Sequence, residues 1–141
     1  MGGDEHTVAL KDTVAPQDAV DLAEKFLTTF RDRDWEALAS LFAPDITWSM
    51  PGHGTISGTA AGAAAAVERA REIAGTGVRT ELLHVLSGRH GAALLLRNTA
   101  TADDGRTLDE HLATVLTMSG GRIAAIDSYL SDVQGMSAFF R

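Results

Sequence analysis

The sequence contains no cysteine among its 141 residues, and it has few basic residues. Without cysteine, disulfide bonds, thiol catalysis and thiolate metal sites are excluded. The 12 lysine and arginine residues stand against 19 aspartate and glutamate residues, which gives a net charge of −7. An acidic chain without a basic stripe repels phosphate backbones, so we expect no nucleic-acid partner.

Long apolar runs are also missing. The longest uninterrupted ones are residues 63–67 and 92–96, far below the roughly 18 residues that a membrane helix needs. The first residues, MGGDEHTVALKD, lack the apolar segment of a secretory signal. We therefore expect no membrane partner and a cytoplasmic location.

What is present suffices for one folded unit, since 45% of the residues are apolar. Residues 1–15 are polar and irregular, and they are predicted to form a flexible N-terminal tail. Residues 16–141 are predicted to form a single domain, because no repeat or low-complexity linker interrupts them.

The periodicity of apolar residues predicts helices first and strands later. Helical spacing covers residues 16–34, 35–43 and 59–75, with a strand predicted at 45–50 and a short segment at 55–58. Alternation with a period of two then predicts four strands, at residues 78–88, 91–102, 106–118 and 122–131. Residues 132–141 add a final helical turn. The order predicts an α+β fold with helices on one face of a curved antiparallel sheet.

Three stretches of sequence together resemble one family. They are FRDRDWEALASLFAPDITW, PGHGTISGTAAG and GGRIAAIDSYLSD. Their order and spacing resemble the SnoaL-like group of the nuclear transport factor-like, or ketosteroid isomerase-like, superfamily, over roughly residues 17–141. The family's glycine in the first stretch is Arg33 here.

The resemblance implies a curved antiparallel sheet wrapped around three helices, forming a cone with an internal pocket. It also implies a homodimer formed through the outer face of the sheet. Activities in such families include isomerases, polyketide cyclases, epoxide hydrolases and dehydratases, and other members only bind ligands. Fold alone does not decide between them.

The family's catalytic groups are largely replaced in this chain. Met50 stands at the position of the isomerase base, and Phe26 and Thr114 stand at the positions of its Tyr and Asp donors. A thioether cannot take a proton from carbon, and a phenyl ring donates no hydrogen bond. By resemblance to limonene epoxide hydrolase-type members, Arg97 keeps the bridging arginine, whereas Thr99 and Ser128 replace the two aspartates.

Three residues remain as catalytic candidates: Glu110, Arg97 and His84. With Thr114 and Ser128 facing the pocket, strand alternation also turns Glu110 inward. Glu110 is then an acid/base group, oriented by Arg97, which also stabilises a developing enolate. His84 is a candidate proton shuttle. The alternatives are a structural ion pair for Glu110 and Arg97, and a core or rim histidine for His84.

The other pocket residues are candidates for binding ligand rather than reacting. The alternatives are ordinary core packing for Trp48, Met50 and Phe26, and a solvated loop position for His53. A mostly apolar pocket with a few polar points suits a hydrophobic small molecule that carries oxygen. No third ligand joins Asp109 and His111, so no metal site is expected, and no cofactor is implied. The expected ligand-binding residues are Trp48, Met50, His53, Phe26, Thr99, Leu112, Thr114, Ile126 and Ser128.

The sequence thus favours a cofactor-independent enzyme of the polyketide cyclase or isomerase type. It would act by acid/base proton transfer on a hydrophobic carbonyl compound. The alternative is a non-catalytic binding module for a hydrophobic small molecule, and a third option is a protein-interaction domain.

Overall fold

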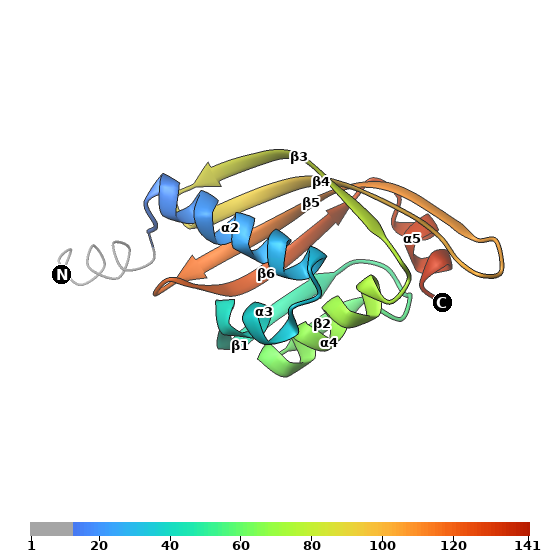
Figure 1. Ribbon diagram of the computed structural model, residues 1–141, viewed down its shortest axis with the longest axis horizontal. Coiled ribbons are helices and arrows are strands. Elements are labelled where there is room, and N and C mark those ends of the chain that lie inside the picture. Colours follow the sequence, from blue (N-terminus) through green and yellow to red (C-terminus); the bar gives the residue numbers. More distant parts are fainter. Residues whose placement is uncertain (1–12) are drawn as a thin grey trace.

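The computed structural model describes residues 13–141, which form four helices and six strands (Figure 1). The tail predicted over residues 1–15 lies outside the described residues except for its last three. The helices are α2 (Pro16–Arg31), α3 (Trp35–Leu41), α4 (Ala63–Ala74) and α5 (Val133–Phe139). The strands are β1 (Phe42–Met50), β2 (Gly58–Ala61), β3 (Arg79–Gly88), β4 (Gly91–Thr101), β5 (Thr107–Ser119) and β6 (Arg122–Leu130).

The six strands form one sheet in the order β2-β1-β6-β5-β4-β3. All neighbouring pairs are antiparallel except β1 and β6, which run parallel. Helices α2, α3 and α4 lie against one face of the curved sheet, and α5 lies at the far end of the long strands (Figure 1). The α+β fold is therefore as predicted, with α5 as a fourth helix.

Helices α2 and α3 begin at the residues that the sequence indicates. Pro16 lies in the first turn of α2, where its missing N–H costs nothing, and the apolar stripe of this helix is buried. Asp34 caps α3, because its side chain accepts a hydrogen bond from the backbone N–H of Ala37. Arg33, directly before that cap, adopts a left-handed backbone conformation with φ 56°.

The segment before α4 differs from its prediction. Residues 59–61 belong to β2 and pair with β1, with Ser49 opposite Thr59, so the helix does not begin at residue 59. Gly62 separates strand from helix with φ 95°, and its N–H donates to the carbonyl oxygen of Ile46. Pairing with β1 satisfies backbone groups that a longer helix would satisfy internally, and tertiary context overrides alanine propensity here.

A bulge in β3 changes which of its side chains face inward. Leu82 pairs with Leu96 and His84 pairs with Leu95, so Leu83 is the extra residue between them. The alternation therefore reverses after Leu82, and Val85 rather than His84 is half-buried. The prediction that His84 faces the pocket is wrong for this reason.

None of the helices formed by residues 13–141 is long and apolar enough to span a membrane.

Candidate functional site

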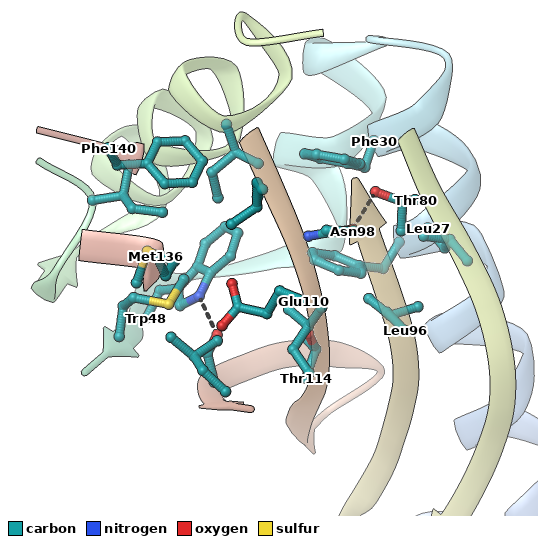
Figure 2. Close-up of a pocket in the computed structure, with 18 residues that line it drawn as sticks. Leu27, Phe30, Trp48, Thr80, Leu96, Asn98, Glu110, Thr114, Met136 and Phe140 are labelled. Carbon is teal, nitrogen blue, oxygen red and sulfur yellow. Dashed lines mark hydrogen bonds between the residues drawn. The ribbon is translucent and has the colours of Figure 1, made fainter. Parts of the chain in front are cut away.

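A cavity opens between α2, the inner face of the sheet and α5 (Figure 2). It is mostly apolar, and its polar side chains come from β3, β4, β5 and β6. The residues that line it are Phe26, Leu27, Phe30, Trp48, Met50, Ile56, Ile73, Thr80, Leu96, Asn98, Leu108, Glu110, Leu112, Thr114, Ser128, Leu130, Met136 and Phe140.

The cavity is narrow. Its volume is about 50 Å³. This is room for a few waters at roughly 10–15 Å³ each. A ring-sized ligand therefore requires the walls to move. Met50 and Met136 are flexible side chains that suit such adjustment.

Glu110 is the charged residue of the cavity. Its side chain comes from β5, where Leu108, Thr114 and Leu116 on the same face are also buried. Glu110 is only 3% exposed, and among the described residues its Oε1 finds no hydrogen-bond partner. A buried carboxylate oxygen without a donor is costly and is rarely left in a purely structural role.

Burial raises the pKa of Glu110 to about 7, because desolvation disfavours the carboxylate. The backbone N–H of Asp132, at the start of α5, donates to the carboxylate and opposes this rise, whereas the negative charge of Asp132 adds to it. A group with this pKa exists in both protonation states near neutrality. It can therefore both accept and return a proton.

The wall opposite α2 is fixed by Trp48. Its indole Nε1 donates to Ser128 Oγ at 3.1 Å, which joins β1 to β6 inside the cavity. Phe26 of α2 meets the Trp48 ring edge-on at 6.3 Å between centroids. Phe26, Trp48 and Ser128 all line the cavity, as expected from the sequence.

Arg69 of α4 binds the backbone of the strand and loop that form the same wall. It is 9% exposed, and it donates to the carbonyl oxygens of Trp48 (2.5 Å), Gly58 (3.1 Å) and Ser57 (3.3 Å). Desolvation lowers the pKa of this guanidinium. Arg69 therefore ties the loop after β1, which contributes Ile56 to the cavity, to α4.

Arg97 does not accompany Glu110. It lies on the outer face of the sheet, where its Nε and Nη2 donate to the two carboxylate oxygens of Asp109 at 2.9 and 2.8 Å. These hydrogen bonds raise the pKa of Arg97 and lower that of Asp109. Arg97 is opposite His111 in the ladder, and His111 is the neighbour of Glu110 on β5, so Arg97 and Glu110 lie on opposite faces of the sheet. The expectation that Arg97 contacts Glu110 is therefore wrong.

Other expected site residues also lie outside the cavity. Thr99 shares the outer face with Arg97 because the two are separated by one residue on β4. His84 is exposed beyond the β3 bulge. His53 lies on the outside of its loop, near α5, and its backbone N–H donates to Ser137 Oγ at 3.1 Å. Ile126 is buried at 1% exposure but is not among the lining residues.

The remaining expected ligand-binding residues, Met50, Leu112 and Thr114, line the cavity. Two polar lining residues were not expected as site residues: Thr80 and Asn98. Thr80 Oγ1 donates to Asn98 Oδ1 at 2.7 Å, and Figure 2 shows the pair at the side of the cavity next to Phe30. No local signal places Asn98 inside, because the preceding run Leu94, Leu95 and Leu96 is apolar on both faces of β4.

Within residues 13–141, no group of three histidine, aspartate or glutamate side chains is arranged to hold a metal ion.

Comparison with known proteins agrees with this architecture. Residues 23–126 match the family model described as a SnoaL-like domain. An uncharacterized protein of Mycobacterium tuberculosis, Rv0034, is 27% identical over 124 residues, which are 86% of this chain and 95% of that protein.

Two solved structures share the fold. Bal32a, from a soil-derived mobile gene cassette, superposes with a TM-score of 0.83 at 26% identity, over 89% of this chain and 98% of its own. An NTF2-like protein of Burkholderia xenovorans LB400 superposes with a TM-score of 0.79 at 18% identity, over 90% of this chain and 98% of its own.

Proposed function

Because the chain belongs to the SnoaL-like domain family, whose fold encloses a cavity here, we propose that it is a small acid/base enzyme. It transfers a proton on a hydrophobic substrate that contains a carbonyl group, as polyketide cyclases and isomerases do. Glu110 carries the proton, and no cofactor takes part.

One observation carries this proposal. Glu110 is buried in an apolar cavity, its Oε1 has no partner among the described residues, and its pKa is raised to about 7. A carboxyl group placed in this way resembles the tuned acids and bases of enzymes that act near neutral pH. A structural carboxylate would instead be paired, as Asp109 is with Arg97 on the outer face.

The proton-transfer step follows from this placement. The Glu110 carboxylate removes a proton from the carbon next to the substrate carbonyl. The electrons of that C–H bond form the C=C bond of the enolate, and the π electrons of the C=O bond move to the oxygen. The resulting carboxylic acid then returns the proton to the same or another carbon of the enolate. The apolar walls from Trp48, Leu108 and Leu112 exclude water while this happens.

The test uses 2-tetralone, a bicyclic ketone with acidic protons next to the carbonyl, and measures exchange of those protons in D₂O. The wild-type protein is expected to accelerate exchange, and Glu110→Gln to lower the rate about 100-fold or more. Asp109→Asn is the matched control, because it alters the neighbouring carboxylate on the outer face. A Glu110→Gln protein that exchanges as fast as wild type contradicts the assignment.

A second candidate function is binding without chemistry. It is favoured by the replacement of the family's isomerase groups with Met50, Phe26 and Thr114, all of which line the cavity. Saturable binding of 2-tetralone with no acceleration of exchange at any pH between 5 and 9 supports the binding module and rejects the enzyme.

Dimerisation through the outer sheet face is part of the same proposal. Tyr129 is 65% exposed on that face of β6, and an exposed aromatic side chain is common at protein interfaces. Light scattering of the wild-type protein and of Tyr129→Lys tests it. A dimer that becomes a monomer in the variant is expected, and a monomeric wild type contradicts it.

A further inference from the structure

A row of polar groups crosses the inner face of the sheet at one level. In the ladder, Thr80 of β3 is opposite Asn98 of β4, and Asn98 is opposite Glu110 of β5. All three side chains line the cavity. Directly opposite residues on antiparallel strands have Cβ atoms about 4.5–5.5 Å apart. The side chains of Asn98 and Glu110 therefore extend from neighbouring Cβ atoms in an otherwise apolar wall.

We infer that Asn98, held by Thr80, donates the hydrogen bond that binds the substrate's carbonyl oxygen beside Glu110. This inference rests on the proposed function and names its substrate class. The site selects compounds whose carbonyl, enol or phenol oxygen points at β4 while the carbon next to that carbonyl lies at Glu110.

The orientation of the Asn98 amide supports this role. Thr80 Oγ1 donates to Asn98 Oδ1 at 2.7 Å, which occupies the amide oxygen and fixes the plane of the amide. Figure 2 shows the amide nitrogen of Asn98 directed into the cavity, on the side that holds Glu110. Among the described residues the Asn98 side chain has Thr80 as its hydrogen-bond partner, so both Nδ2 hydrogens are available to a ligand.

The other donors of the cavity are less well placed. The Trp48 indole N–H is committed to Ser128. Thr114 lies on the same strand as Glu110 but four residues further along, so the Cα atoms of the two residues are about 13 Å apart at the rise of a strand. Ser128 is opposite Thr114 in the ladder and lies at that same distant level. Asn98 is directly opposite Glu110 in the ladder, so its side chain is the donor that starts nearest to the Glu110 side chain on the sheet.

The lining also explains why a neutral amide is the donor. The lining residues include no lysine, arginine or histidine. A cation next to Glu110 would hold its carboxylate ionised and lower its pKa. An amide stabilises developing negative charge on a substrate oxygen without adding a charge of its own.

The test compares binding of two molecules that share one ring system. 2-Naphthol has the oxygen of the 2-tetralone enol, and naphthalene lacks it. We expect Asn98→Leu to weaken 2-naphthol binding about 10-fold, as for one lost hydrogen bond, and to leave naphthalene binding unchanged. Thr99→Val, at the next residue on the outer face, is the matched control and should bind both as the wild type does.

Thr80 supplies a second and milder variant. Thr80→Val keeps the shape but loses the bond that orients Asn98, so 2-naphthol should bind about 3-fold more weakly. Thr80→Ser should restore binding, which a purely packing role for Thr80 would not predict. If Asn98→Leu does not fold, the comparison of Thr80→Val with Thr80→Ser decides the matter.

The outcomes separate this inference from the proposed function. An unchanged preference for 2-naphthol over naphthalene in Asn98→Leu or Thr80→Val overturns the role of Asn98, whatever the exchange rates are. A wild type that binds neither molecule overturns it as well. Loss of the preference in Asn98→Leu, without any Glu110-dependent exchange, supports the donor site and rejects only the enzyme.

Discussion

Arg69 and Trp48 are joined twice in this structure. The Nη1 of Arg69 donates to the main-chain carbonyl oxygen of Trp48 at 2.5 Å, and its guanidinium carbon lies 5.9 Å from the centroid of the Trp48 ring. One side chain of α4 therefore fixes both the backbone and the ring of the residue that forms the cavity wall. The position of that wall depends on a helix that itself contributes little else to the lining.

Replacing Arg69 with leucine should destabilise the protein and loosen the loop after β1. Three carbonyl oxygens lose their donor, and we expect the free energy of unfolding to fall by about 2–4 kcal/mol. Urea denaturation measures the loss, and hydrogen exchange should show faster exchange at residues 51–58. Arg71→Leu is the control, since Arg71 is an exposed residue of the same helix. Equal stability of the two variants would contradict the clamp.

Glu110→Gln should change how stability depends on pH. The folded pKa of about 7 lies above the ordinary value of 4.5, so the native state holds its proton more tightly than the unfolded state does. The contribution of Glu110 to the free energy of unfolding of the wild type is therefore largest below pH 4.5, and it decreases as the pH rises from 4.5 to 7.

The glutamine variant lacks that dependence. We expect it to gain stability relative to wild type between pH 5 and pH 8, on the order of 3 kcal/mol in total. Denaturation midpoints at both pH values measure the change, and Asp109→Asn serves as control for a carboxylate on the outer face. A constant difference between wild type and Glu110→Gln across this range would mean that the pKa is not raised.

The exchange rate of 2-tetralone should also depend on pH through Glu110. The carboxylate is the form that takes the proton, so kcat/KM should rise with pH and level off above about 7, the pKa of the free enzyme's base. A profile that is flat from pH 5 to 9 would exclude Glu110 as the base.

Arg33 should tolerate glycine better than alanine. Its φ of 56° is unfavourable for a side chain, and its Nη2 donates to the carbonyl oxygen of Ala74 at 2.9 Å. Arg33→Ala keeps the strain and loses the bond, so the free energy of unfolding should fall by about 1 kcal/mol. Arg33→Gly loses the same hydrogen bond, but it also relieves backbone strain of about 1 kcal/mol, so its free energy of unfolding should stay near that of the wild type. Thermal unfolding of both variants decides whether the order is as stated.

Gly91 should not tolerate even alanine. A Cβ at this position would meet the carbonyl oxygen of Leu116, which is main chain and cannot move aside cheaply. We expect Gly91→Ala to cost more than about 3 kcal/mol, as overpacking against backbone does. Gly88 faces Gly91 across the same turn, and a Cβ there would come only within 4.0 Å of the carbonyl oxygen of Gly91, an ordinary contact distance. Gly88→Ala should therefore cost far less in a urea titration.

The inward face of β5 could be predicted from the sequence, because Glu110, Leu112 and Thr114 alternate with outward residues. The face of β4 could not. Its run Leu94, Leu95, Leu96 is apolar on both sides, so alternation gives no direction, and the resemblance pointed to Arg97 as the inward residue. The structure turns Leu94, Leu96 and Asn98 inward instead.

The fold was predicted more fully than the site. Helical and strand periods are local properties of the chain, and they indicated α2, α3 and the four long strands. The bulge at Leu83 depends on pairing between β3 and β4, which no local pattern records. That single extra residue is enough to move His84 from the cavity to the surface.

The parallel pairing of β1 with β6 has a consequence for how the chain acquires its structure. Trp48 lies beside Ile126, 78 residues later in the sequence. During synthesis on a ribosome, β1 emerges early, but it cannot pair with β6 until almost the whole chain has been made. Contacts at such long separation slow folding. The nascent protein should therefore expose an apolar strand edge for most of its synthesis, and it should depend on chaperones more than an α-helical bundle of equal length.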